Sequence, residues 1–298
     1  MNEHVNPVMR AILDAVAPKE RTEMTPEQYN AHPGITKSAI CAARIDADTL
    51  SMAAMHASMI ADRTDDSETT PSMRWGTLAH AVLLEPIAFA ARVAVWREAK
   101  RGAAWTAFKA EMEARGRWIV SGPELDKLQA MRTAFQADKD ARWILAQCSK
   151  FELPVDWTDT DYGAGKGRLD GWGEGCVLEY KTSRNVGKRA FLRSAFTSGY
   201  HLGAAWYWHG AGRPASVYVI NQQNVKPWSV VSYMVGRPIL EAAYEEARQI
   251  AVRYRIAEKS GEFPGPYTGI QDFELPAWAA DGAEVDVSSG TMEGGLME

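Results

Sequence analysis

Asp170, Glu179 and Lys181 have the side-chain types and the spacing needed for metal-dependent chemistry. Two neighbouring carboxylates repel each other unless a cation lies between them, and carboxylate oxygens suit Mg²⁺ or Mn²⁺. Such an ion can polarise a phosphoryl oxygen and lower the pKa of a bound water. The lysine can orient that water and stabilise negative charge. The three residues therefore predict a site that hydrolyses phosphodiesters.

A β-hairpin is the element expected to bring these residues together. Glu179 and Lys181 lie two positions apart, so in a strand they share one face. A two-residue turn at Glu174–Gly175 pairs Gly173 with Cys176, and the same register places Asp170 opposite Glu179. Directly opposed Cβ atoms lie about 5 Å apart. The alternative is a plain solvated strand face, because short motifs of this kind also arise by chance.

The rest of the chain predicts helices first and then strands mixed with helices. Helices are expected at Met73–Leu84, over most of 88–147, at Val186–Gly210 and at Pro238–Lys259; strands are expected at Phe151–Trp157, Arg168–Gly173, Cys176–Thr182, Ala215–Asn221 and Trp228–Val235, with a polar loop at Asp159–Gly167. This order predicts a mixed α/β domain with one central sheet.

Composition excludes several classes of protein. The 298 residues carry a net charge of −5, so a nucleic-acid role needs a local basic surface or metal ions rather than a global positive field. No apolar stretch reaches the roughly 20 residues of a membrane span, and Met1–Arg10 is not a secretory signal. We therefore expect a cytoplasmic protein that does not bind membranes. The cysteines Cys41, Cys148 and Cys176 are too few for a four-cysteine iron–sulfur cluster.

Five sequence segments occur in a characteristic order: His32–Ser38 (HPGITKS), Met73–His80 (MRWGTLAH), the hairpin from Gly167 to Thr182, Tyr200–Tyr207 (YHLGAAWY), and Phe263–Gly265 with Leu275–Trp278. Together they resemble the PD-(D/E)xK nuclease superfamily, and more closely its RecE-type (exonuclease VIII) phage exonucleases, with lambda-type exonuclease more distant. The resemblance covers roughly residues 25–280. It implies a restriction-endonuclease-like α/β core, a central mixed sheet flanked by helices, with a helical N-terminal portion.

The resemblance also implies roles for residues. Asp170 and Glu179 would bind the metal with His80 as a further ligand, Lys181 would be the catalytic lysine, and Ser38 would contact a terminal DNA phosphate. The implied activity is metal-dependent 5′→3′ digestion of linear double-stranded DNA, which leaves 3′ single strands for recombination. Relatives form rings around DNA and work with a single-strand annealing protein.

A run of basic residues near the hairpin is the candidate DNA-backbone surface: Arg168, Arg184, Lys188, Arg189 and Arg193. Lysine and arginine contact phosphates without reading sequence; the alternative is a solvated helix face. Lys166 is a weaker candidate of the same kind. Glu152, on the preceding strand, is a candidate third carboxylate of the site, although a surface residue is the plainer interpretation.

One position departs from the family pattern. Gly203 stands where relatives carry a glutamine that reaches the active-site water or DNA, and His201 is the candidate substitute. Tyr207, between two tryptophans, is an accessory candidate for base stacking, although core or interface packing is the plainer interpretation. The same residues leave two other functions open: a restriction-like or structure-specific endonuclease, or a non-catalytic DNA-binding protein.

The expected organisation is an N-terminal extension over 1–24, a single nuclease domain over 25–280 and a disordered tail over 281–298. Residues after about Asp281 are rich in Gly, Ser and Glu, a composition that buries too little apolar surface to fold.

Overall fold

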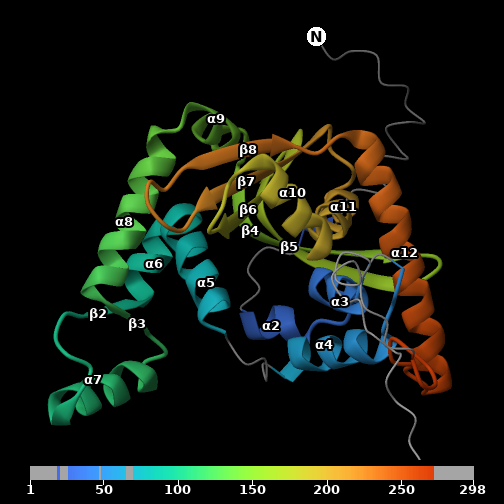
Figure 1. Cartoon of the computed structure of the whole chain (residues 1–298), viewed down its shortest axis with the longest axis horizontal. Coiled ribbons are helices and arrows are strands. Elements are labelled where there is room, and N and C mark those ends of the chain that lie inside the picture. Colours follow the sequence, from blue (N-terminus) through green and yellow to red (C-terminus); the bar gives the residue numbers. More distant parts are fainter. Residues whose placement is uncertain (1–18, 21–25, 47, 65–69, 272–298) are drawn as a thin grey trace, which may run out of the picture. The chain divides into compact units, whose positions relative to one another are not determined.

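One mixed sheet carries the residues singled out above. A computed structural model describes residues 19–20, 26–46, 48–64 and 70–271 and places six strands in the order β1-β4-β5-β6-β7-β8 (Figure 1). The strands are β1 (Lys19–Glu20), β4 (Lys150–Asp159), β5 (Gly163–Gly173), β6 (Cys176–Ser183), β7 (Ser216–Gln223) and β8 (Val230–Met234). β6 and β7 pair in parallel, whereas the other neighbours are antiparallel. The sheet is mixed and flanked by helices, as predicted.

Helices cover both faces of this sheet. Their bounds are α2 (Pro26–Ala31), α3 (Lys37–Ala43), α4 (Met52–Thr64), α5 (Pro71–Leu84), α6 (Pro86–Arg92), α7 (Gly102–Ala114), α8 (Gly122–Ala137), α9 (Lys139–Gln147), α10 (Lys188–Thr197), α11 (Tyr200–Gly210) and α12 (Arg237–Ser260). One apolar cluster joins Val177 and Val217 of the sheet to α3, α4, α11 and α12. A second joins Leu178 and Tyr180 to α5, α8 and α9. Because neighbouring strand residues point to opposite faces, β6 contributes to both clusters.

The predicted loop over Asp159–Gly167 is largely wrong, because β5 already begins at Gly163. Gly165, which suggested a loop, instead leaves space for the ring of Trp157 beside the strand, as does Gly210 of α11. A Cβ on Gly165 would lie 2.5 Å from the Trp157 ring, and one on Gly210 of α11 would lie 2.3 Å from the same ring. Glycine in a strand often marks such a close approach.

Residues 88–147 are not helical throughout. They contain β2 (Val93–Trp96) and β3 (Trp118–Ser121), a parallel pair flanking α7. The valines and tryptophans of these segments favour strands, but each strand has only four residues and so gives little period-2 signal. The predicted helix Val186–Gly210 divides into α10 and α11 at Gly199, whose φ of 67° is left-handed.

The chain falls into two units, residues 1–266 and residues 267–298. Every helix and strand named above belongs to the first unit. The proposed tail over 281–298, the segment Leu275–Trp278 and most of the proposed extension over 1–24 lie outside the described residues. No helix in the described ranges is both long and apolar enough to cross a bilayer.

Candidate metal-dependent active site

The predicted hairpin register is confirmed near the turn. Gly173 pairs with Cys176, and the last pair joins Gly171 to Leu178. Asp170 lies one residue beyond that pair, and its Oδ2 accepts a 2.7 Å hydrogen bond from the backbone N–H of Tyr180. β5 and β6 therefore diverge where the carboxylates begin, and this backbone N–H fixes the orientation of the Asp170 carboxylate.

His80 reaches this point from α5. That helix begins with Thr70, whose hydroxyl accepts the N–H of Met73, and with a proline in its first turn, a combination typical of helix starts. His80 Nε2 lies 2.9 Å from the carbonyl oxygen of Tyr180. A carbonyl only accepts, so Nε2 carries the proton and Nδ1 is the metal-binding or titrating nitrogen. Metal-binding histidines commonly show this backbone contact.

Glu152 completes a cluster of three potential metal ligands with His80 and Asp170. His80 Nδ1 lies 3.6 Å from Glu152 Oε1 and 3.8 Å from Asp170 Oδ1. One potential ligand atom from each residue lies within 4.8 Å of the other two. These three form the one such group found among the described residues.

Of the two interpretations of Glu152, the structure favours the third carboxylate, because only 19% of its side chain is exposed and it lies with His80 and Asp170. It lies between the β4–β5 pairs Phe151–Gly171 and Leu153–Leu169, directly across from Asp170. Its φ of 50° is unusual for a residue with a side chain, and such strain gathers at functional sites. The β4–β5 register would have strengthened this candidate from sequence if the start of β5 had been recognised.

Glu179 faces two ammonium groups. Its Oε1 accepts a 2.6 Å hydrogen bond from Lys37 Nζ and a shorter one from Lys181 Nζ. Within the described part of the chain, its Oε2 is buried without a hydrogen-bond partner. Buried polar atoms are almost always paired, so this oxygen is available to a ligand, as is the lone pair of His80 Nδ1. Glu179 itself is not among the three residues whose ligand atoms lie within 4.8 Å of one another. The donor set, one imidazole nitrogen and carboxylate oxygens, suits a divalent metal.

The charges of the site depend on one another. Burial raises the pKa of Asp170, and the neighbouring Glu179 carboxylate raises it further. Burial alone would raise the pKa of Glu179 as well, but Lys181 and Lys37 lower it. Burial would lower the pKa of His80, yet Asp170 and Glu152 raise it above its usual value. Raised pKa values and the ammonium groups of Lys37 and Lys181 therefore offset the negative charge of these carboxylates.

A cleft of about 980 Å³ opens over these groups. Of the residues considered from sequence, it is lined by Ser38, His80, Glu152, Lys166, Arg168, Asp170, Lys181 and Tyr207. The Arg168 Nε lies 3.4 Å from Glu152 Oε2, and its guanidinium lies over the Tyr29 ring. Ser38 is exposed in the first turn of α3, whereas Tyr207 is largely buried in α11 beneath the cleft.

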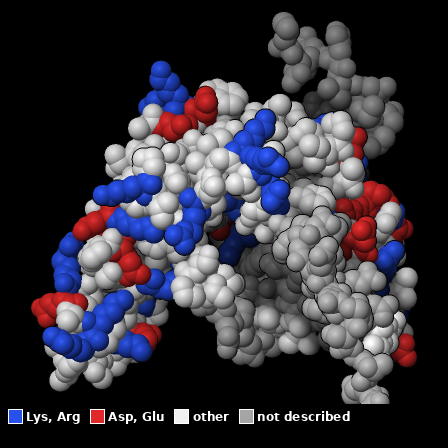
Figure 2. All heavy atoms as spheres, viewed as in Figure 1, with Lys and Arg blue, Asp and Glu red and all other residues white. Residues whose placement is uncertain are grey.

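The remaining basic candidates lie beside the cleft rather than in its lining. Arg184 follows β6, and Lys188, Arg189 and Arg193 lie on α10, all four with exposed side chains. Lys and Arg side chains gather over α10, next to a hollow in the surface (Figure 2). They are placed to meet a polyanion that approaches the cleft.

Two residues predicted to take part in the site, His201 and Lys166, are engaged in contacts within the protein instead. His201 stacks on Phe196, with ring centroids 5.0 Å apart, and its Nε2 lies 4.0 Å from Glu246; it is not among the described residues that line the cleft. Lys166 is 2% exposed, and its ammonium donates to the carbonyls of Tyr29, Asn30 and His32. It therefore joins β5 to the end of α2 rather than meeting a phosphate.

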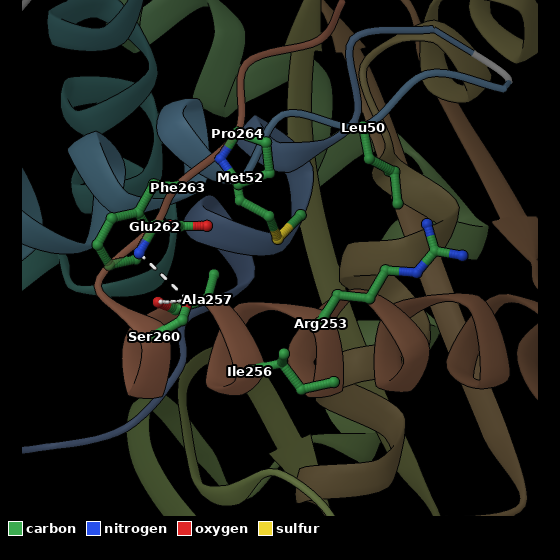
Figure 3. A pocket seen from close by; sticks show the side chains of 9 residues that line it. All are labelled: Leu50, Met52, Arg253, Ile256, Ala257, Ser260, Glu262, Phe263 and Pro264. Carbon is green, nitrogen blue, oxygen red and sulfur yellow. Dashed lines mark hydrogen bonds between the residues drawn. The ribbon is translucent and has the colours of Figure 1, made fainter. Parts of the chain in front are cut away.

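A second pocket, of about 720 Å³, lies where α12 and residues 262–264 meet α4 (Figure 3). Apolar side chains such as Met52, Ile256 and Phe263 dominate its wall, with Arg253 and Glu262 at its edge. It holds none of the three clustered metal ligands.

No protein-family model matches this sequence, and no curated protein matches it. Among solved structures, the chain resembles one described as "Putative exonuclease" from Eubacterium rectale, with a TM-score of 0.54, 12% identity, and coverage of 89% of this chain and 100% of that one. A second match, LHK-Exo in complex with dAMP, has a TM-score of 0.27, 12% identity, and coverage of 54% and 87%. The first comparison supports the predicted fold class.

Proposed function

We propose that this protein is a metal-dependent exodeoxyribonuclease acting on linear double-stranded DNA. The observation that carries the proposal is the convergence of His80, Glu152 and Asp170 within 4.8 Å, beside the Glu179 carboxylate and its lysines. The shared fold with a protein described as an exonuclease supports the same function.

Each residue of the site has a role under this proposal. His80 Nδ1, Asp170 and Glu179 would hold Mg²⁺ or Mn²⁺, and Glu152 would join them, since its carboxylate lies with those of the His80–Asp170 group. The bound metal would polarise the phosphoryl oxygen and acidify a water. Lys181 orients the attacking water and stabilises the negative charge that develops on the phosphate. The backbone of Tyr180 positions two of the proposed ligands. Its N–H donates to Asp170, and its carbonyl accepts from His80 and so sets the His80 tautomer.

The DNA backbone would be held by side chains around the cleft. Arg168 lines the wall next to the metal ligands, and Arg184, Lys188, Arg189 and Arg193 extend the basic surface over α10. Ser38 is the proposed contact to a terminal phosphate, since its hydroxyl is exposed in the cleft. These contacts neutralise phosphates and carry little sequence information.

The finer features follow from the resemblance described above. They are 5′→3′ polarity, 3′ single-stranded products used in recombination, a ring-shaped homo-oligomer and a single-strand annealing partner. Sedimentation velocity tests the assembly directly, because the mass of a ring must be a multiple of the 32.9 kDa mass of one chain. A monomer at working concentration contradicts the ring.

The deciding experiment compares a linear duplex with the same DNA as a closed circle, each with Mg²⁺ and with EDTA. One strand of the duplex carries a label at its 5′ end. Metal-dependent loss of that strand from linear DNA alone supports a 5′→3′ exonuclease. Cutting of the circle indicates an endonuclease, and binding without cutting indicates a non-catalytic DNA-binding protein.

A further inference from the structure

Lys37 reaches the same carboxylate oxygen as the proposed catalytic lysine, although it lies 142 residues from Glu179 in sequence. Its backbone position is fixed from two sides. Ile35 forms a parallel bridge to Gly165 of β5, and the Thr36 hydroxyl accepts the N–H of Ala39 at the start of α3. The Lys37 side chain then extends into the cleft, with 22% of its surface exposed.

Gly203 provides the space in which the Lys37 side chain lies. A Cβ on Gly203 would be 2.6 Å from Lys37 Cδ and 2.9 Å from Cγ, closer than non-bonded carbons approach. Gly203 lies inside α11, where glycine costs roughly 0.5–1 kcal/mol relative to alanine. One turn later, the Tyr207 ring lies 4.5 Å from Lys37 Nζ. Gly203 and Tyr207 thus form a seat that directs the Lys37 ammonium.

Glu179 Oε1 accepts hydrogen bonds from both ammonium groups, Lys37 Nζ and Lys181 Nζ. A divalent cation on that carboxylate repels ammonium groups nearby, because like charges interact strongly in a site of low dielectric. The stem of Lys37 is confined by its seat, so its ammonium can move only within the cleft. A phosphate oxygen is the acceptor that a nuclease substrate brings there, and a lysine binds phosphate as a point charge.

We propose that Lys37, seated on Gly203, is a second phosphate-binding cation of this active site, transferred from Glu179 to the DNA when a metal binds. The inference rests on the proposed function and deepens it. In this chain the lysine enters the space above Gly203 that a longer side chain at that position would fill.

The salt dependence of DNA binding tests the transfer. The probe is a duplex with phosphorothioate linkages that resist hydrolysis, measured by fluorescence anisotropy with Ca²⁺ and with EDTA. Each phosphate contact contributes about one unit to the slope of log K against log salt. With Ca²⁺, Lys37→Ala should lower that slope by about one and weaken binding about tenfold. With EDTA, the variant and the wild type should have the same slope.

Two matched variants complete this experiment. Lys37→Arg should keep most of the affinity with Ca²⁺, since it retains the charge and the reach. Lys139→Ala removes an exposed lysine at the start of α9. It should change neither the affinity nor the salt slope, with Ca²⁺ or with EDTA. An unchanged slope for Lys37→Ala with Ca²⁺ overturns the proposal, and so does an equal loss of slope in both arms.

A double-mutant cycle tests the seat itself. Gly203→Ala should reproduce the Ca²⁺-dependent loss of slope and affinity by displacing Lys37, and in the Lys37→Ala background it should cause no further loss. Gly175→Ala, in a turn where a Cβ meets nothing within 4 Å, is the control glycine. If the losses of affinity and slope from Gly203→Ala and Lys37→Ala add up in the double variant, Gly203 does not position Lys37.

The binding readouts keep this inference separate from the proposed function. If the wild type cleaves DNA but Lys37→Ala binds with an unchanged slope, only the inference fails. If the wild type cleaves no DNA in Mg²⁺ or Mn²⁺, the proposed function fails. The Ca²⁺ arm then still decides whether Lys37 contacts phosphate.

Discussion

The imidazole of His80 is held between a backbone carbonyl and two carboxylates, and this arrangement determines how the site responds to pH. Nε2 donates to Tyr180, so Nδ1 is the atom that takes either a proton or a metal. Asp170 and Glu152 raise the pKa of His80 against the effect of burial. Proton and metal therefore compete for one nitrogen.

We expect the metal-free protein to lose stability as the pH rises through the folded-state pKa of His80. A raised folded pKa contributes stability that is fully present below the unfolded value of about 6.5 and disappears above the folded value. Urea unfolding in EDTA between pH 6 and 9 measures this, with His80→Gln as the reference. The wild type should lose more stability than His80→Gln over that range; parallel curves contradict the assignment.

Asp170→Asn should separate metal binding from folding. The amide oxygen still accepts the Tyr180 N–H, while the repulsion between two buried carboxylates is removed. In EDTA the variant should melt at or above the wild-type temperature. Addition of Mn²⁺ should raise the Tm of the wild type, because a ligand that binds only the folded state stabilises it, and should leave the variant unchanged. An equal Tm increase in both proteins refutes the role of Asp170 as a ligand.

Lys181→Ala should lower the cleavage rate by about 10²–10³-fold, the usual cost of removing one group that stabilises the charge developing in the transition state. Folding should persist, since 19% of the lysine side chain is exposed and Lys37 still pairs with Glu179. Initial rates on a linear duplex measure the effect, and circular dichroism checks the fold. Wild-type rates from a folded variant would exclude Lys181 from the chemistry.

At the scale of elements, α11 packs against the sheet through glycines that admit aromatic rings. Gly210 meets the Trp157 ring, Gly203 meets Lys37, and Gly167 of β5 meets the Tyr207 ring. In a sequence these glycines look like loop residues or helix breakers. Their function in packing becomes visible only when two segments far apart in sequence are placed together.

Two helical glycines should therefore respond oppositely to the same substitution. Gly210→Ala forces a Cβ to 2.3 Å from the Trp157 ring and should destabilise the protein by about 1–3 kcal/mol, as overpacking does. Gly76→Ala in α5 meets nothing within 4 Å and should stabilise it by up to about 1 kcal/mol through helix propensity. Urea midpoints distinguish the two; a stabilising Gly210→Ala contradicts the packing argument.

Local sequence determines some elements and not others. The hairpin register near the turn followed from a two-residue turn, and the end of α5 at Leu84 followed from Pro86 and the apolar run before it. By contrast, sequence offered Glu152 only as a minor candidate, and the β4–β5 register and its left-handed backbone were needed to place it in the site. The contact between Lys37 and Glu179 spans 142 residues, and no periodicity within a short window encodes a pairing of that range.

For the molecule as a whole, the distribution of charge matters more than its sum. The net charge is −5, yet exposed basic side chains gather over α10 beside the cleft (Figure 2). Binding of DNA should therefore be local and strongly dependent on salt. The acidic balance elsewhere limits binding along the rest of the surface.

Reversing the charge of Arg189 and Arg193 should weaken DNA binding without altering the chemical step. Arg189→Glu/Arg193→Glu should lower affinity similarly for duplexes of any sequence and reduce the salt slope by about two, if each arginine contacts one phosphate. The rate at saturating DNA should stay near that of the wild type. A pair of exposed arginines outside α10, Arg115 and Arg142, supplies the control. Unchanged affinity of the α10 variant would place the DNA elsewhere.

The seat of Lys37 also has a consequence for the timing of synthesis. The site draws on Lys37 near the beginning of the chain, on the hairpin in its middle and on Gly203 in α11. A ribosome must release more than two hundred residues before these parts can meet. Under the proposed function, a growing chain would therefore lack the complete site until α11 has been made, and any fragment that stops short of α11 carries the carboxylates without it.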